Sequence, residues 1–187
     1  MPQNISDKHI ILGDREFSLY IPYEAIEESV AALAERITAD YENKPDPLFL
    51  GVLNGSFMFL AELVKMIDRP AEISFVKLAS YNGTKTTGTV SELVGLSTDV
   101  KGRHVIIVED IVDTGESIEH LMRSLIGHEP ASIEVATLLF KPESYSKAIP
   151  IKYKAFSIPN DFVVGFGMDY NQMGRNLRDI YTIVDGE

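Results

Sequence analysis

Short apolar runs alternate with amphipathic stretches along the chain, and this alternation is the feature that most limits its fold. Apolar residues recur at helical spacing over residues 23–41, 55–67 and 115–127. Runs typical of strands lie at 48–53, 71–80, 103–109 and 131–140, and an extended pair turns at Gly13-Asp14 near the N-terminus. Strands that alternate with helices predict an α/β fold with a doubly wound, mainly parallel sheet.

Composition excludes several classes of protein. The chain has 187 residues, which suits one domain with a sizeable core. Acidic residues outnumber basic ones by 28 to 17, so the net charge is −11 and we expect no nucleic acid partner. There is no cysteine, which excludes disulfides and thiolate chemistry. The first residues are polar and no apolar run approaches the roughly 18 residues of a membrane span, so we expect a cytoplasmic protein with no membrane partner.

Three acids follow the strongest predicted strand, in the stretch VIIVEDIVDTGES at 105–117. In an open parallel sheet, ligands bind beyond the carboxyl ends of the strands, where we expect Glu109 and Asp110. These acids can receive cations or hydroxyl groups. We expect residues 113–117 to form the turn into the next helix, whose free N–H groups suit a phosphate. A ribose 5-phosphate, with a phosphate and vicinal hydroxyls a sugar ring apart, satisfies both.

Plainer interpretations of these acids remain open. Asp113 can be only the N-cap of the following helix, with the other acids solvated, although this leaves Glu109 and Asp110 unexplained. A phosphatase-like Asp-x-Asp motif is a second alternative, but its spacing differs from the one found here. Neither GxxxxGK[ST] nor GxGxxG occurs in the chain, and its four histidines show no metal-ligand spacing.

The stretch 105–117 resembles the phosphoribosyl-diphosphate (PRPP) motif of the type I phosphoribosyltransferases, in particular those of purine salvage that act on hypoxanthine. The resemblance covers about Leu48 to the end of the chain. Its further segments are GVLNGSFMF at 51–59, Ser80-Tyr81, Lys141 in LLFKPE, and PNDFVVGFGMDYNQMGRN at 159–176. Found together and in this order, these segments are a strong signature.

The resemblance implies a type I phosphoribosyltransferase fold in a single domain, residues 1–187. Its core is expected at about 23–157, and a small hood is expected from the terminal segments, about 1–22 and 158–187. The implied reaction transfers the 5-phosphoribosyl group of PRPP to hypoxanthine, and also to guanine, and releases diphosphate. The products are inosine and guanosine monophosphate. The resemblance also implies Mg²⁺ as cofactor and a homodimer or homotetramer.

The resemblance further implies a role for each residue around PRPP. The ribose phosphate is assigned to the whole motif: Glu109, Asp110, Ile111, Val112, Asp113, Thr114, Gly115, Glu116 and Ser117. Asp113 is implied as the catalytic general acid/base that exchanges a proton with N7 of the purine. Diphosphate is assigned to Asn54, Gly55 and Arg175. Mg²⁺ is assigned to Glu109, Asp110 and Asp169, because an acidic protein needs a metal to mediate its contact with a polyanion.

The implied purine site comprises Lys141, Phe162, Val163 and Asp169. Lys141 is expected to donate to O6 of the base. A solvated surface lysine is the alternative, but such a residue has no special reason to follow the apolar run of 135–140. Phe162 is expected to stack on the purine, although an ordinary core aromatic is the alternative. Val163 is expected to present backbone groups to the base edge. Ser80 and Tyr81 precede the glycine- and threonine-rich loop 81–89, which is expected to close as a lid.

Two residues depart from the family pattern, and two rival functions are open to a chain of this fold class. Asn54 stands where a basic residue is common, and Glu116 puts an acid in the phosphate turn, so we expect its side chain to point to solvent.

One rival function is a non-catalytic PRPP-sensing regulator on the same fold, which the net charge of −11 disfavours. The other is a phosphorelay receiver, in which the 159–176 segment has no place.

Overall fold

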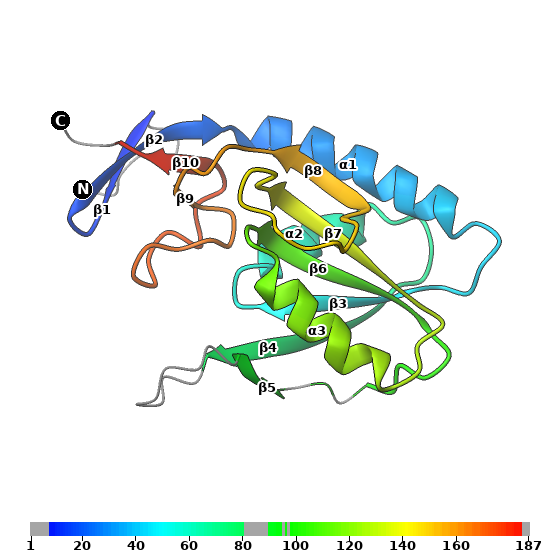
Figure 1. The fold of residues 1–187 in the computed structure, drawn as a ribbon. Coiled ribbons are helices and arrows are strands. Elements are labelled where there is room, and N and C mark those ends of the chain that lie inside the picture. The colour runs from blue at the N-terminus through cyan, green and yellow to red at the C-terminus, as the bar shows by residue number, and fades with distance from the viewer. Residues whose placement is uncertain (1–7, 81–89, 95, 97, 185–187) are drawn as a thin grey trace.

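The computed structural model describes residues 8–80, 90–94, 96 and 98–184 of the chain. Its helices and strands are shown in Figure 1. In chain order they are β1 (His9–Leu12), β2 (Arg15–Ile21), α1 (Tyr23–Asp40), β3 (Leu48–Leu53), α2 (Phe57–Lys65), β4 (Glu72–Ser80), β5 (Val90–Val94), β6 (His104–Val112), α3 (Glu116–Ile126), β7 (Ser132–Phe140), β8 (Tyr153–Ser157), β9 (Val163–Val164) and β10 (Ile180–Ile183).

The larger sheet has the strand order β5-β4-β3-β6-β7-β8. Neighbouring strands are parallel from β4 to β8, and β5 runs antiparallel to β4 at the edge. Helices α1 and α2 pack on one face of this sheet and α3 packs on the other (Figure 1). This arrangement confirms the predicted doubly wound, mainly parallel sheet.

Two hydrophobic clusters lie on opposite faces of the larger sheet. Phe49 and Ile106 point toward α1 and α2, whereas Leu48 and Ile107 point toward α3. Because side chains alternate along a strand, each central strand is buried on both faces and reads as a continuous apolar run. This is why β3 and the first part of β6 could be recognised from their composition.

A smaller antiparallel sheet, which we call the hood, has the strand order β1-β2-β10-β9. Strand β10 lies between β2 and β9, so the hood joins residues 9–21 to residues 163–183. The predicted turn at Gly13-Asp14 does connect β1 to β2. Strands β8, β9 and β10 had no clear signal in the sequence. The assignment of residues 1–187 to a single domain stays a prediction.

Strand β6 is longer than its sequence pattern predicted. The expected strand over 103–109 continues to Val112, because Ile111 and Val112 pair with Leu139 and Phe140 of β7. On its other side, β6 pairs with β3 only as far as Val108. The first two acids of the motif therefore lie within β6 beside the open end of β3, and not beyond the strand.

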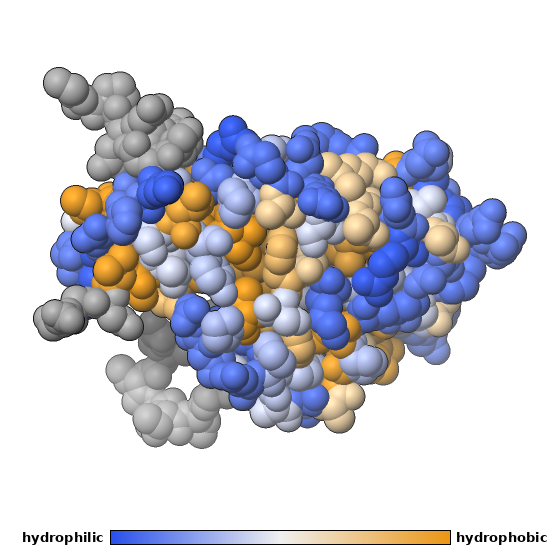
Figure 2. Space-filling model, turned by 90° about the horizontal axis from the view of Figure 1, so that it is seen from above, coloured by the Kyte–Doolittle hydropathy of each residue, from blue (hydrophilic) through white to orange (hydrophobic). Residues whose placement is uncertain are grey.

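The surface seen in Figure 2 mixes polar and apolar residues. On this face, apolar side chains show mainly toward the middle and the end that carries the hood, while the opposite end is mainly hydrophilic (Figure 2). Among the residues that the structure describes, no helix is both long enough and apolar enough to cross a membrane.

Candidate active site

The two adjacent acids of the motif serve opposite faces of the sheet. Asp110 lines a pocket of about 270 Å³ that also includes residues of β7 and the hood. Glu109 lines a smaller hollow of about 90 Å³ formed with residues 111–118. Alternation of side chains along β6 separates the two carboxylates in this way, which reduces the repulsion expected from their neighbouring positions.

The larger pocket brings together all four residues predicted to contact the base. Its lining comprises Asp110, Ile111, Asp113, Lys141, Phe162, Val163, Met168 and Asp169. These residues come from β6 and the turn that follows it, the end of β7, and the segment 162–169 of the hood. They are close together only because β6 and β7 are neighbours in the sheet and the hood folds over their carboxyl ends.

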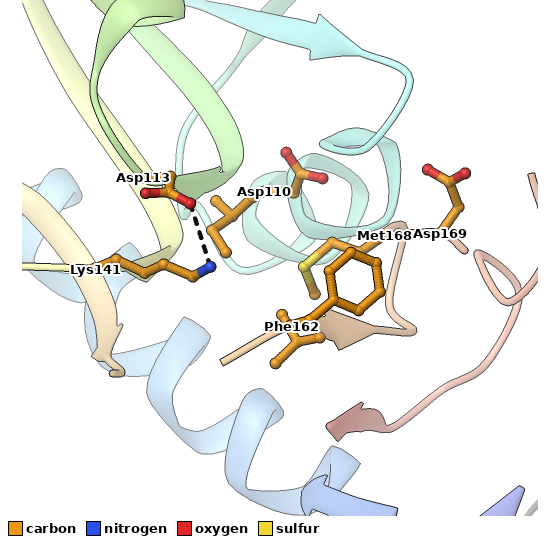
Figure 3. A pocket seen from close by; sticks show the side chains of 8 residues that line it. Asp110, Asp113, Lys141, Phe162, Met168 and Asp169 are labelled. Atoms are coloured by element: carbon orange, nitrogen blue, oxygen red, sulfur yellow. Dashed lines mark hydrogen bonds and ion pairs between the residues drawn. The ribbon is translucent and has the colours of Figure 1, made fainter. Parts of the chain in front are cut away.

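Lys141 and Asp113 form an ion pair at one side of this pocket (Figure 3). The distance from Lys141 Nζ to Asp113 Oδ2 is 3.2 Å. The Lys141 side chain is only 10% exposed, whereas that of Asp113 is 48% exposed. The backbone N–H of Lys141 also donates to the Val112 carbonyl, which fixes the lysine backbone beside the motif. The pocket therefore holds a nearly buried cation next to a reachable carboxylate.

An aromatic and a thioether side chain lie together across the pocket. Phe162 and Met168 are neighbours in Figure 3, away from the Lys141–Asp113 pair. Phe162 is 46% exposed, although its ring centroid lies 6.4 Å from that of Phe17 and 6.1 Å from that of Tyr170. A core aromatic would be covered, so the observed exposure favours a surface that is available for stacking. Val163, in contrast, is buried at the start of β9.

The turn that follows β6 forms the smaller hollow. Every residue from Ile111 to Ile118 lines it, Val112, Thr114, Glu116 and Ser117 included. Gly115 is the N-cap of α3 and has a φ of +85°, a conformation that favours glycine. In the described part of the chain, the N-cap position of this helix makes no side-chain capping hydrogen bond. The alternative that Asp113 is only an N-cap is therefore wrong: the cap is Gly115, and Asp113 pairs with Lys141.

Free backbone donors at this turn suit an anion. The first N–H groups of an α-helix have no partner within the helix, and the helix dipole places partial positive charge there. In α3, Glu116 N–H reaches only the Thr114 hydroxyl, at 3.5 Å. The geometry matches the expectation of a phosphate seat, and the residue roles themselves stay predictions.

Both acids of β6 lie in surroundings that disfavour charge. Burial raises the pKa of the Glu109 carboxyl well above its ordinary value, and the neighbouring Asp110 carboxylate adds to this. Burial likewise raises the pKa of Asp110 to about 6, although two backbone N–H donors and the Arg175 guanidinium lower it. Glu109 Oε2 is buried with no hydrogen-bond partner among the described residues. Each group would gain from a bound cation.

The turn after β3 is pressed against Asp110. A Cβ added at Gly55 would lie 1.7 Å from Asp110 Oδ2, and one added at Gly167 would lie 2.0 Å from the Gly55 carbonyl oxygen. Both positions therefore require glycine, and Gly167 lies directly against the turn that follows β3. The peptide bond from Leu53 to Asn54 is cis. Asn54 itself is exposed and lines neither hollow.

Asp169 and Arg175, which were assigned to metal and diphosphate, form an ion pair with each other. Arg175 Nη2 lies 2.6 Å from Asp169 Oδ1, and Arg175 Nη1 donates to the Gly167 carbonyl at 2.8 Å. The second oxygen of Asp169 accepts the backbone N–H of Gln172 at 2.7 Å. Each side chain is 23% exposed. The pair therefore lies at the mouth of the site, where a polyanion can compete for the guanidinium.

The residues present fit Mg²⁺ on chemical grounds. Mg²⁺ prefers carboxylate, phosphate and water oxygens and commonly binds through one or two carboxylates together with substrate phosphates. The part of the chain that the structure describes has no group of three or more acids, histidines or cysteines that could hold a metal by itself. The unpartnered Glu109 oxygen and the Asp110 carboxyl suit a metal whose other ligands come from the substrate.

Two parts of the site differ in how far the sequence could anticipate them. Met168 lines the pocket but is not among the site residues predicted from the sequence, although it directly precedes Asp169 in the segment 159–176. Ser80 ends β4, whereas Tyr81 and the rest of the loop 81–89 lie outside the described residues, so the lid stays a prediction.

The arrangement has close counterparts among known proteins. A model of the phosphoribosyl transferase domain matches residues 22–171. The chain belongs to the phosphoribosyltransferase family. It is 47% identical over 155 residues to the hypoxanthine-guanine phosphoribosyltransferase of Lactococcus lactis, covering 82% of this chain and 84% of that protein. It is 42% identical over 158 residues to the hypoxanthine phosphoribosyltransferase of Haemophilus influenzae, covering 83% and 88%.

A solved phosphoribosyltransferase structure agrees with the fold. The crystal structure of a hypoxanthine-guanine phosphoribosyltransferase from Bacillus anthracis superposes with a TM-score of 0.82 at 35% identity. The match covers 90% of this chain and 97% of that one. The type I phosphoribosyltransferase fold expected from the sequence is thereby confirmed.

Proposed function

We propose that this phosphoribosyltransferase is a purine-salvage enzyme that transfers the 5-phosphoribosyl group of PRPP to hypoxanthine and guanine. The observation that carries the proposal is the nearly buried Lys141 ammonium, 3.2 Å from Asp113, opposite an exposed Phe162 ring. These three groups provide a donor, a proton acceptor and a stacking surface for a flat base. The names and the 42–47% identities of the two relatives also support it.

The reaction requires a group that accepts a proton from the base and groups that stabilise the charges that develop on the sugar and the diphosphate. A purine nitrogen forms a bond to C1 of the ribose, while the bond from C1 to diphosphate oxygen breaks and its electron pair leaves with diphosphate. The base then loses a proton, which Asp113 accepts through its half-exposed carboxylate. Developing positive charge on the sugar is stabilised by the acids of β6, and the departing polyanion is met by Arg175.

Mg²⁺ is proposed as the cofactor. Bound together with PRPP, it would neutralise the diphosphate and so assist its departure. Glu109 and Asp110, which face different hollows, are the residues proposed to hold Mg²⁺, each from its own side of β6, with Asp169 at the outer edge of the site. An acidic chain with a net charge of −11 otherwise repels a polyanionic substrate.

The base preference follows from the donor chemistry of Lys141. A protonated amine only donates, so it suits an acceptor at C6 of the purine. Hypoxanthine and guanine carry oxygen at this position, whereas adenine carries an amino group that also donates. We therefore propose that adenine is refused. The cytoplasmic location and the homodimer or homotetramer expected from the sequence stay predictions.

One assay tests this function. Purified protein is mixed with PRPP, Mg²⁺ and hypoxanthine, guanine or adenine, and the nucleotide product is separated and quantified. Production of inosine and guanosine monophosphate, without adenosine monophosphate, is the expected result. Binding of PRPP without any turnover would instead favour the PRPP-sensing regulator, which no described feature of the site supports.

A further inference from the structure

Lys147 lies between two acids of α3, beside the turn that forms the smaller hollow. Its Nζ is 2.5 Å from Glu116 Oε1 and 2.9 Å from Glu119 Oε2. The lysine side chain is only 16% exposed, whereas that of Glu116 is 62% exposed. The hydrogen bond to Glu116, and to a smaller extent the one to Glu119, raises the pKa of the Lys147 ammonium, so it remains charged.

The segment that carries Lys147 is packed on the same turn. Ser146 donates from both its backbone N–H and its hydroxyl to the Thr114 carbonyl, each at 3.4 Å. A Cβ added at Gly115 would lie 2.8 Å from Lys147 Cγ and 2.5 Å from a ring carbon of Tyr145. The lysine stem therefore covers the turn from outside, and its ammonium reaches the helix start.

Glu116 poses an electrostatic problem for phosphate binding. It lines the hollow of about 90 Å³ together with the rest of the turn, whereas Glu119 does not line it. Two like charges a few ångströms apart near a protein surface repel each other strongly. The Glu116 side chain points largely to solvent, at 62% exposed, and its carboxylate is held by Lys147.

We propose that Lys147 is a positioning residue for substrate binding: it holds and neutralises the Glu116 carboxylate, so that the turn 113–117 can accept the 5-phosphate of the substrate. The proposal rests on the proposed function for the identity of that phosphate. Lys147 acts through Glu116 and does not touch the phosphate itself. It compensates for an acid that the phosphate turn would otherwise tolerate poorly.

The test compares single and double variants by two readouts. Calorimetry measures the Kd of ribose 5-phosphate, which needs no turnover, and steady-state assays with hypoxanthine measure KM for PRPP and kcat. Lys147→Met should raise both Kd and KM about tenfold with kcat within about twofold, because it weakens binding and not the chemical step. Lys147→Arg keeps the charge and should stay within about twofold of the wild type.

The decisive comparison is between two double variants. Glu116→Gln/Lys147→Met removes the acid that lines the hollow and should restore Kd and KM to within about twofold of the wild type. Glu119→Gln/Lys147→Met leaves that acid in place and should stay impaired. The matched control is Lys101→Met, which removes another lysine from an ion pair with a glutamate (Nζ to Glu129 Oε2, 2.6 Å) and should change neither constant.

Three results would overturn the proposal. The first is a folded Lys147→Met protein with unchanged affinity, and the second is equal restoration of affinity in both double variants. The third is no restoration of affinity by Glu116→Gln, which would mean that Lys147 contacts the phosphate directly. If Lys147→Met does not fold, the Glu116→Gln double variant still decides, since normal ribose 5-phosphate affinity supports the proposal and a tenfold loss overturns it. Absence of nucleotide formation by the wild type would refute the proposed function alone, because the calorimetry remains interpretable.

Discussion

At the scale of single residues, Lys141 is a nearly buried cation that forms an ion pair with Asp113. Facing adenine, its ammonium would meet another donor. Sites built around one hydrogen bond reject a mismatched analogue by about 10⁴-fold or more. Lys141→Ala should therefore lower kcat/KM for hypoxanthine and guanine and erode the preference over adenine, with less effect on PRPP binding. Steady-state assays with each base at saturating PRPP and Mg²⁺ measure this.

The wild-type protein already provides a check on Lys141. If adenine turned over within about tenfold of hypoxanthine, the discrimination would be only about 1.4 kcal/mol. That is too little for a buried charged donor that faces the wrong group, and the assignment of Lys141 would be abandoned.

Asp113 offers a second prediction at this scale. Its carboxylate is half-exposed in the pocket, clear of the residues that cap α3. Asp113→Asn preserves the shape of the side chain but removes its ability to accept a proton, so kcat should fall by about 10² to 10⁴. The Kd of ribose 5-phosphate should change much less. Wild-type turnover by this variant between about pH 6 and 9 would contradict general acid/base catalysis.

At the scale of elements, the start of α1 depends on a residue from the other end of the chain. The N-cap position is Pro22, which has no side chain that can cap the helix. Asp179 supplies the missing acceptor, because its Oδ1 accepts the backbone N–H of Tyr23 at 2.7 Å. The Asp179 side chain is buried and also accepts the Tyr181 hydroxyl at 3.4 Å. The hood is thus attached to the first helix of the core.

Asp179→Ala should accordingly destabilise the protein. Loss of an N-cap acceptor costs about 1 to 2 kcal/mol, and a buried N–H without a partner adds to this. Chemical denaturation of the variant and the wild type measures the change in unfolding free energy. Asp68→Ala, at an exposed position, is the control and should change this free energy by less than about 0.5 kcal/mol. Equal stability of the two variants would show that Asp179 does not cap α1.

At the scale of the whole molecule, ion pairs between distant segments predict how the protein responds to acid. Asp40 ends α1 and accepts hydrogen bonds from Lys152 at 2.9 Å and from Tyr153 of β8 at 2.8 Å. The hydrogen bond from Lys152 is the largest cause that lowers the pKa of Asp40 below its ordinary value of 3.8, and the hydrogen bond from the Tyr153 hydroxyl is the next. The unfolded chain therefore binds the proton more tightly, so this stabilisation is present above about pH 4 and is lost as the pH falls below it.

Asp40→Asn removes this pH-dependent part. The variant should lose less unfolding free energy than the wild type as the pH falls through and below about 4. Denaturation at a series of pH values in this range measures the difference. Asp110, with a raised pKa of about 6, acts in the opposite direction at higher pH, so the comparison belongs below that window. Identical acid profiles for the two proteins would contradict the assignment of Asp40.

The sequence by itself determined the fold class and much of the site. Apolar runs buried on both faces of a sheet, and helices with one apolar face, have periodicities that can be seen in a linear string. Strands such as β3 and β7 and the helices α1, α2 and α3 were therefore predictable. The motif 109–117 was also recognisable, because a glycine-containing turn between a buried strand and a helix is local in sequence.

Only the tertiary structure decided the contacts between distant segments. Short hood strands such as β9 and β10 have no periodicity to detect, and the pairing of β10 with β2 and of β9 with β10 depends on the whole chain being folded. The same is true of Asp179 at the start of α1 and of Lys147 beside Glu116, which lie 156 and 31 residues from their partners. A side chain's partner across such distances is set by how strands and helices pack, and single-residue patterns carry no record of that packing. The sequence therefore indicated which chemistry the chain carries, and the fold decided which charges meet.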